Sequence, residues 1–179
     1  MSTAYSLAEA GKKVLFIDAD LRKSVLTGRY KISGEMKGLT HFLSGQGDLS
    51  EILCKTNEKG LFVIFAGPVP PNPAELLGSK KVLRRFLKEA RNIYDYIIID
   101  TPPLGSVIDS AIVSAVCDAA ILVISANTIS YKFARSVKDQ LAKTGCNILG
   151  VVLNKVSMKQ NKYYGKYYGK YYGHYGSDK

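Results

Sequence analysis

The sequence VLFIDADLR, at residues 14–22, decides the fold of this 179-residue chain. It begins with a continuous run of apolar side chains and ends in two carboxylates, Asp18 and Asp20. A short, continuous apolar run is typical of a strand that is buried on both faces of a parallel sheet. Because side chains alternate along an extended segment, Asp18 and Asp20 are expected to point to the same side.

Four further apolar runs repeat this strand pattern, at residues 61–65, 96–99, 120–124 and 148–153. Apolar residues at helical spacing lie between them, over residues 80–92, 109–116 and 131–143. Strands that alternate with helices predict a doubly wound α/β fold with a mostly parallel sheet and helices on both faces. We expect this core to span residues 1–157.

Composition favours one soluble domain. The chain is 46% hydrophobic and 22% charged, which is an ordinary globular balance. No run approaches the roughly 18 apolar residues of a membrane span, and the first residues lack the features of a secretory signal. The three cysteines, Cys54, Cys117 and Cys146, have no metal-binding spacing and are expected to be reduced thiols. We therefore expect a cytoplasmic protein.

The C-terminal residues 158–179 break the pattern of the core. The sequence KYYG occurs three times over residues 162–173, and frequent glycine predicts a tail that is disordered when free. From Lys155 onward, six lysines against one acid contribute half of the net charge of +10. This charge suits an anionic partner such as a membrane surface, nucleic acid or nucleotide phosphates, or else a solvated tail with no partner.

A second apolar run also ends in an acid, Asp100, which is followed by Thr-Pro-Pro. Ligands of open parallel sheets bind beyond the carboxyl ends of the strands, and one carboxylate there can hold Mg²⁺ directly or through water. Alternatively, Asp100 caps a turn and Asp18 and Asp20 are solvated. Two such acidic strand ends in one chain favour a magnesium–nucleotide site. Arg22 could neutralise phosphate charge or pair with these acids.

These segments resemble those of one family. Residues 16–23 (FIDADLRK) look like the second Walker motif, and residues 100–103 (DTPP) like the Walker B segment, of bacterial tyrosine kinases of capsular and exopolysaccharide biosynthesis. Residues 67–77 (GPVPPNPAELL) are similar to the family's Pro-rich signature, and the terminal tyrosines to its phospho-acceptor tail. The Walker segments alone would also fit partitioning and cell-division ATPases, so the other two features make the resemblance specific.

The resemblance implies a P-loop NTPase-type fold with ATP and Mg²⁺ as cofactors, and Asp18, Asp20 and Asp100 as catalytic residues. Asp18 is expected to accept the proton of the incoming tyrosine and Asp20 to hold the metal or its waters, although these two roles could be exchanged. Asp100 is expected to hold Mg²⁺ from the Walker B side.

Four further residues are implied to bind the nucleotide or metal. The hydroxyl of Ser2 or Thr3 would ligate Mg²⁺, with Ser2 the better match. Arg22 would contact phosphate, and Asn154 would contact adenine unless it simply ends a strand in an ordinary turn.

The beginning of the sequence departs from the family's pattern. The family has a strand and a glycine-rich loop ending in Gly-Lys-Ser/Thr before its first helix, whereas here Met1 stands at the lysine position. We expect a gap in the central sheet, and a sequence that is shortened or starts at a misplaced codon. In-frame Gly-Lys codons directly upstream would support this expectation, and a stop codon would contradict it.

The resemblance predicts an ATP-dependent protein-tyrosine kinase that autophosphorylates its C-terminal tyrosines in trans and regulates polysaccharide synthesis and export. The expected partners are a membrane adaptor of the polysaccharide co-polymerase type, further copies in a ring and protein tyrosine substrates, with no nucleic acid. The adaptor would hold the kinase at the inner face of the membrane. The expected phospho-acceptors are Tyr163, Tyr164, Tyr167, Tyr168, Tyr171, Tyr172 and Tyr175.

Two alternatives stay open. One is an inactive or regulatory domain of the same fold. The other is a partitioning-type ATPase whose basic tail binds DNA or membrane; it predicts salt-sensitive DNA binding and no phosphotyrosine.

Overall fold

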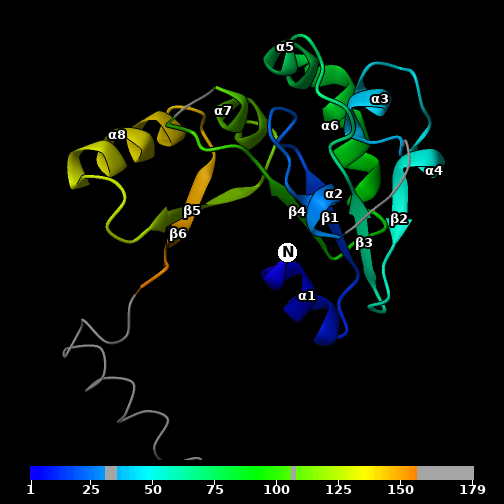
Figure 1. Cartoon of the computed structure of the whole chain (residues 1–179), viewed down its shortest axis with the longest axis horizontal. Coiled ribbons are helices and arrows are strands. Elements are labelled where there is room, and N and C mark those ends of the chain that lie inside the picture. The colour runs from blue at the N-terminus through cyan, green and yellow to red at the C-terminus, as the bar shows by residue number, and fades with distance from the viewer. Residues whose placement is uncertain (31–35, 106–107, 157–179) are drawn as a thin grey trace, which may run out of the picture.

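The computed structural model describes residues 1–30, 36–105 and 108–156 (Figure 1). Its strands are β1 (Val14–Asp18), β2 (Leu53–Lys55), β3 (Leu61–Ile64), β4 (Tyr96–Asp100), β5 (Ala119–Ser125) and β6 (Asn147–Asn154). Its helices are α1 (Ser2–Glu9), α2 (Leu26–Arg29), α3 (Leu39–Leu43), α4 (Leu49–Ile52), α5 (Pro73–Gly78), α6 (Lys80–Ala90), α7 (Asp109–Ser114) and α8 (Tyr131–Ala142). The expected tail lies outside the described residues, so the division near residue 157 stays a prediction.

A four-stranded sheet forms the main body, with the strand order β2-β3-β1-β4. β1 pairs in parallel with β3 on one side and with β4 on the other, while β2 adds an antiparallel edge. The structure therefore confirms the mostly parallel α/β class and all five predicted strands. The sequence did not predict β2, because three residues are too few to form a recognisable apolar run.

Helices cover both faces of this sheet, as predicted. Leu15 and Ile17 of β1 belong to an apolar cluster that includes residues of α3, α5, α6 and α7. Val14 and Phe16 point to the other face, into a cluster with residues of α1 and α2. The alternation of side chains along one fully buried strand thus separates two cores, and it fixes the direction in which β1 delivers Asp18.

β5 and β6 form a separate, parallel two-stranded sheet (Figure 1). Among the described residues the sheet is interrupted between β4 and β5, in agreement with the expected gap. Burial of these strands on both faces was wrongly predicted: Val123 is 61% and Leu149 67% exposed. The reason is that β5 and β6 pair only with each other in the described part of the chain. α8 packs against β6 with its buried Val137 and Leu141, but the consecutive residues Val151, Val152 and Leu153 all stay exposed.

Further contacts join the smaller sheet to the main body. Arg91, after α6, forms an ion pair with Asp118, just before β5, at 2.8 Å. Cys117 packs against the main core, and burial raises its pKa to about 11. Cys54, Cys117 and Cys146 are all free thiols. No helix in the described part of the chain has the length and apolar character needed to cross a membrane.

Candidate active site

The two acidic strand ends lie side by side. Asp18 and Asp100 are partners in the parallel register of β1 and β4, and the amide of Ala19 donates to the carbonyl of Asp100 at 2.8 Å. Neighbouring strands lie about 4.8 Å apart, so both carboxylates leave the same edge of the sheet. Asp20 follows two residues later, and its charge acts on both of the other acids.

Asp18 is the buried member of this group, with 1% of its surface exposed. Its Oδ1 accepts the amide of Asp20 at 3.2 Å, and its Oδ2 accepts the hydroxyl of Ser24. Burial raises the pKa of Asp18, the two hydrogen bonds oppose this effect, and the charges of Asp100 and Asp20 add to it. A carboxylate with a raised pKa holds a proton more firmly, which is the property a general base needs.

Asp20 is half-buried and is oriented by main-chain amides. The amides of Arg22 and Lys23 both donate to its Oδ1, at 3.1 and 2.9 Å. These bonds form a tight turn directly after β1, and they fix the direction of the carboxylate.

Asp100 is exposed on one side, yet nearby protein atoms remove part of its hydration. This desolvation raises the pKa of Asp100, the positive Met1 amine opposes it, and the charge of Asp20 adds to it. The Met1 amine, at the start of α1, therefore lies close enough to Asp100 for its charge to act on this carboxylate. Ser2 and Thr3 occupy that turn, and both are exposed.

Arg22 does not pair with the three predicted acids. Its Nε and one terminal nitrogen donate to the two carboxylate oxygens of Asp109, at 2.6 and 3.0 Å. Sequence reasoning missed this partner, and the signal that could have found it is a lone acid at the start of the small and apolar segment 109–116. It also missed Ser24, for which the sequence gives no comparable signal.

Asn154 lies apart from these acids along the sheet order, at the end of β6 in the two-stranded sheet. Its Oδ1 accepts the amide of Lys155 at 2.8 Å, and Lys155 adopts a φ of 57°. These features describe a turn that ends a strand, so a contact with adenine stays a prediction.

The donor set fits a magnesium ion that is shared with phosphate. No group of three or more His, Cys, Asp or Glu side chains within residues 1–30, 36–105 and 108–156 forms a ready-made metal cage. Mg²⁺ is usually held by one or two carboxylates, with phosphate and water as its other ligands. Asp20 and Asp100 supply carboxylates at the sheet edge, and the exposed Ser2 follows Met1, whose amine acts on Asp100.

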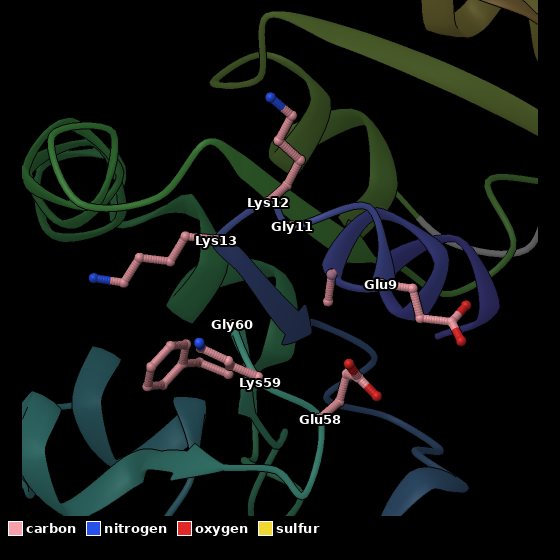
Figure 2. A pocket seen from close by; sticks show the side chains of 9 residues that line it. Glu9, Gly11, Lys12, Lys13, Glu58, Lys59 and Gly60 are labelled. Atoms are coloured by element: carbon pink, nitrogen blue, oxygen red, sulfur yellow. The ribbon is translucent and has the colours of Figure 1, made fainter.

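A hollow of about 600 Å³ lies at the opposite end of the sheet, where β1 and β3 begin (Figure 2). Figure 2 shows the carboxylates of Glu9 and Glu58 on one side, while Lys13 points away from them. The Lys13 amine lies 5.8 and 5.4 Å from the ring centroids of Phe62 and Tyr94. Aromatic rings thus already engage the Lys13 amine, and we assign this hollow no catalytic part.

The contact between Ser24 and Asp18 gives a first prediction. Replacing Ser24 with alanine removes a donor from a buried carboxylate, so the pKa of Asp18 should rise further. The free energy of unfolding at pH 7 should fall by about 1.5 kcal/mol, and by less in acid, where Asp18 is protonated. Chemical denaturation at several pH values measures this loss. Ser136→Ala, on the exposed side of α8, is the matched control, and an equal loss in both variants would contradict the prediction.

The comparisons with known proteins agree with this geometry. Residues 1–149 match the AAA domain family. The tyrosine-protein kinase CpsD of Streptococcus agalactiae serotype Ia is 48% identical over 156 residues, which cover 87% of this chain and 67% of CpsD. The kinase domain of the Escherichia coli tyrosine kinase Etk superposes with a TM-score of 0.77 at 34% identity, over 86% of this chain and 61% of that domain.

A more distant structure carries a nucleotide. The septum site-determining protein MinD of Pyrococcus horikoshii, solved with Mg-ADP, superposes with a TM-score of 0.68 at 25% identity, over 84% of this chain and 60% of MinD. The fold, the acidic edge of the sheet and the similarity to these proteins define an α/β protein of the P-loop NTPase type. Within that class, the chain belongs to the bacterial tyrosine kinases of capsule synthesis, and it spans about two thirds of the length of curated relatives such as CpsD.

Proposed function

We propose that this chain is the catalytic core of an ATP-dependent protein-tyrosine kinase that phosphorylates its own C-terminal tyrosines in trans. The observation that carries the proposal is the placement of Asp18, Asp20 and Asp100 at one edge of the sheet. Phosphoryl transfer depends on positioning and charge neutralisation more than on covalent chemistry, and carboxylates of unequal burial can divide these tasks.

Burial divides the roles among the acids. Asp18, buried and with a raised pKa, would accept the proton of the tyrosine hydroxyl. Asp20 and Asp100, at the accessible edge, would hold Mg²⁺ together with the hydroxyl of Ser2 or Thr3. When bound, ATP supplies the phosphoryl group and Mg²⁺ neutralises its charge.

Arg22 is less suited to bind phosphate than the sequence indicated. Its guanidinium is engaged by Asp109, although 39% of its side chain remains exposed. We therefore propose no direct phosphate contact for Arg22 in this state of the protein.

The tail is the proposed substrate. Its seven tyrosines lie among lysines and glycines, and the chain from Lys155 onward has a net charge of about +5. Each phosphate adds roughly −1.5 to −2, so several would reverse that charge and could disperse copies that are held together by tail docking. A membrane adaptor would bring such copies together in a ring at the inner face of the membrane.

The test is phosphotyrosine formation by the full-length protein with ATP, Mg²⁺ and the adaptor, followed by mass spectrometry. We expect phosphate on several of the tyrosines between residues 163 and 175, and loss of the signal when all of them are phenylalanine. Tyr131→Phe, which removes an 82% exposed tyrosine of α8, should leave the signal unchanged. A tail that is never modified under these conditions would contradict the proposal and favour an inactive or regulatory domain.

Transfer in trans needs a mixing experiment. A copy that carries Asp18→Asn and an intact tail is mixed with an active copy that lacks residues 158–179. Phosphate should appear on the tail of the first copy, at a rate that rises with the concentration of the second. Phosphate that forms only within an active copy would show that transfer is intramolecular.

A further inference from the structure

Within the described part of the chain, one fully buried carboxylate, that of Asp109, has no task in the roles above. Asp109, in the first turn of α7, is 0% exposed. It binds the Arg22 guanidinium through two bonds, from Nε at 2.6 Å and from a terminal nitrogen at 3.0 Å. Burying a carboxylate costs several kcal/mol unless it is well paired, and a two-bond contact with arginine is among the strongest pairings available.

The pair acts on Asp20 through the main chain. The amide of the same Arg22 and that of Lys23 hold Oδ1 of Asp20. Arg22 is therefore held by its side chain at one end, while its backbone orients the proposed metal-binding carboxylate at the other. Leu21 anchors this turn in the main core, whereas the exposed Arg22 is held by its contact with Asp109.

On the α7 side of the contact, the residue next to Asp109 is linked to the segment that follows Asp100. Ser110, the neighbour of Asp109, is also buried, and its hydroxyl donates to the carbonyl of Pro102. Pro102 lies two residues after Asp100, in the segment that leaves β4. Two neighbouring residues of α7 thus bind the turn after β1 and the segment after β4, respectively.

We propose that Asp109 is a positioning residue: through Arg22 it fixes the turn that carries Asp20 relative to the acidic end of β4. The pair links the segment that follows β1 to the segment that follows β4. A small displacement of either segment would move Asp20 away from Asp100. The catalytic consequence of this inference rests on the proposed kinase function, whereas the structural consequence does not.

The experiment replaces Asp109 with asparagine in the full chain and follows solvent exchange of individual amides by NMR. The amides of Arg22 and Lys23 should exchange at least tenfold faster than in the unchanged protein, while those of β1 keep their protection. Arg22→Gln removes the same contact by changing the arginine, whose side chain is partly exposed. This variant replaces Asp109→Asn in the experiment if Asp109→Asn does not fold. Arg22→Lys keeps the charge but loses the two-bond geometry, and an intermediate effect is expected.

A second Arg–Asp pair provides the matched control. Arg91→Gln breaks the contact with Asp118, whose side chain is 87% exposed, and it should leave the amides of Arg22 and Lys23 unchanged. If Arg22→Gln also leaves them unchanged, the positioning inference is wrong and the pair only supports the packing of α7.

A kinetic experiment distinguishes a failure of this inference from a failure of the proposed function. In the full-length kinase, Asp109→Asn should lower kcat for tyrosine phosphorylation at least tenfold, with little change in KM for a tyrosine peptide. Full activity in a variant whose Arg22 and Lys23 amides have lost protection would overturn the catalytic consequence. If the unchanged protein transfers no phosphate at all, the proposed function fails, while the exchange result still decides the role of Asp109.

Discussion

Asp18→Asn is expected to slow tyrosine phosphorylation by at least about 100-fold and, at the same time, to stabilise the folded protein. General base catalysis contributes about 100- to 10,000-fold to a rate, so kcat should fall by at least the lower of these factors. Asparagine has nearly the same shape, and Ser24 and the amide of Asp20 can still bind it, so the fold should persist. Phosphotyrosine formation by the full-length protein measures the first effect.

The gain in stability follows from burial. Asp18 is 1% exposed, and burial is the main cause of its raised pKa, so the native state holds its charge at a cost. A neutral side chain removes that cost and should add about 1 kcal/mol to the free energy of unfolding, or about 2–4 °C to Tm. Such a gain is common where function requires a destabilising residue. The measurement is made without divalent cations, because a bound cation would itself stabilise the carboxylate.

The pH dependence of this gain has a definite sign. Because the pKa of Asp18 is higher in the native state than its ordinary value of 3.8, the native protein binds more protons than the unfolded chain just above that value. The stability of the unchanged protein therefore declines as pH rises through the raised pKa. The asparagine side chain of the variant does not titrate, so its advantage should be absent below about pH 3.8 and complete at neutral pH.

Asp139→Asn is the matched control for this substitution, since Asp139 lies on the exposed side of α8. It should leave activity unchanged and should not reproduce the gain in stability. Normal kinase activity in Asp18→Asn would exclude Asp18 as the base and would move that role to Asp20, the exchange that the sequence left open.

The parts of the fold that could be predicted are those with a one-dimensional signal. β1, β3 and β4 to β6 are continuous apolar runs, and α6 to α8 have apolar residues at helical spacing. The short elements β2, α3 and α4 carry no such signal, because three to five residues cannot show a period. Their places are set by packing around β3 and α5, which a sequence read in order does not reveal.

The candidate site divides in the same way. Asp18 and Asp100 could be predicted because each ends an apolar strand, and parallel strands bring such ends together. The contact between Arg22 and Asp109 joins residues 87 positions apart, so the lone acid at the start of segment 109–116 marks a partner without saying that this partner binds Arg22. The exposure of Val123 and Leu149 could not be predicted either, because an apolar run does not indicate which neighbouring strands are present.

Gly38→Ala is expected to be among the most destabilising single substitutions in this chain. A Cβ at position 38 would lie 2.4 Å from the amide nitrogen of Gly67 and 2.5 Å from the carbonyl oxygen of Phe65. Both are backbone atoms, which cannot turn aside as a flexible side chain can. The free energy of unfolding should therefore fall by about 3 kcal/mol or more, in the range of severe core overpacking.

The reason lies in how α3 docks on the segment that follows β3. The amides of Leu39 and Thr40 donate to the carbonyls of Phe65 and Ala66, at 2.7 and 3.0 Å. Gly67 also lies against Gly38, and its φ of 81° is a conformation that favours glycine. Any Cβ on Gly38 must push this segment away and break the hydrogen bonds that hold it.

Gly28→Ala is the matched control, because Gly28 lies in α2 and a Cβ there would meet nothing within 4 Å. Alanine stabilises a helix interior by roughly 0.5–1 kcal/mol relative to glycine, so the two substitutions should act in opposite directions. Denaturant unfolding measures both. A Gly38→Ala protein as stable as the unchanged chain would show that α3 and the segment after β3 can separate without cost, and that the Pro-rich residues 67–77 are not held in place by this contact.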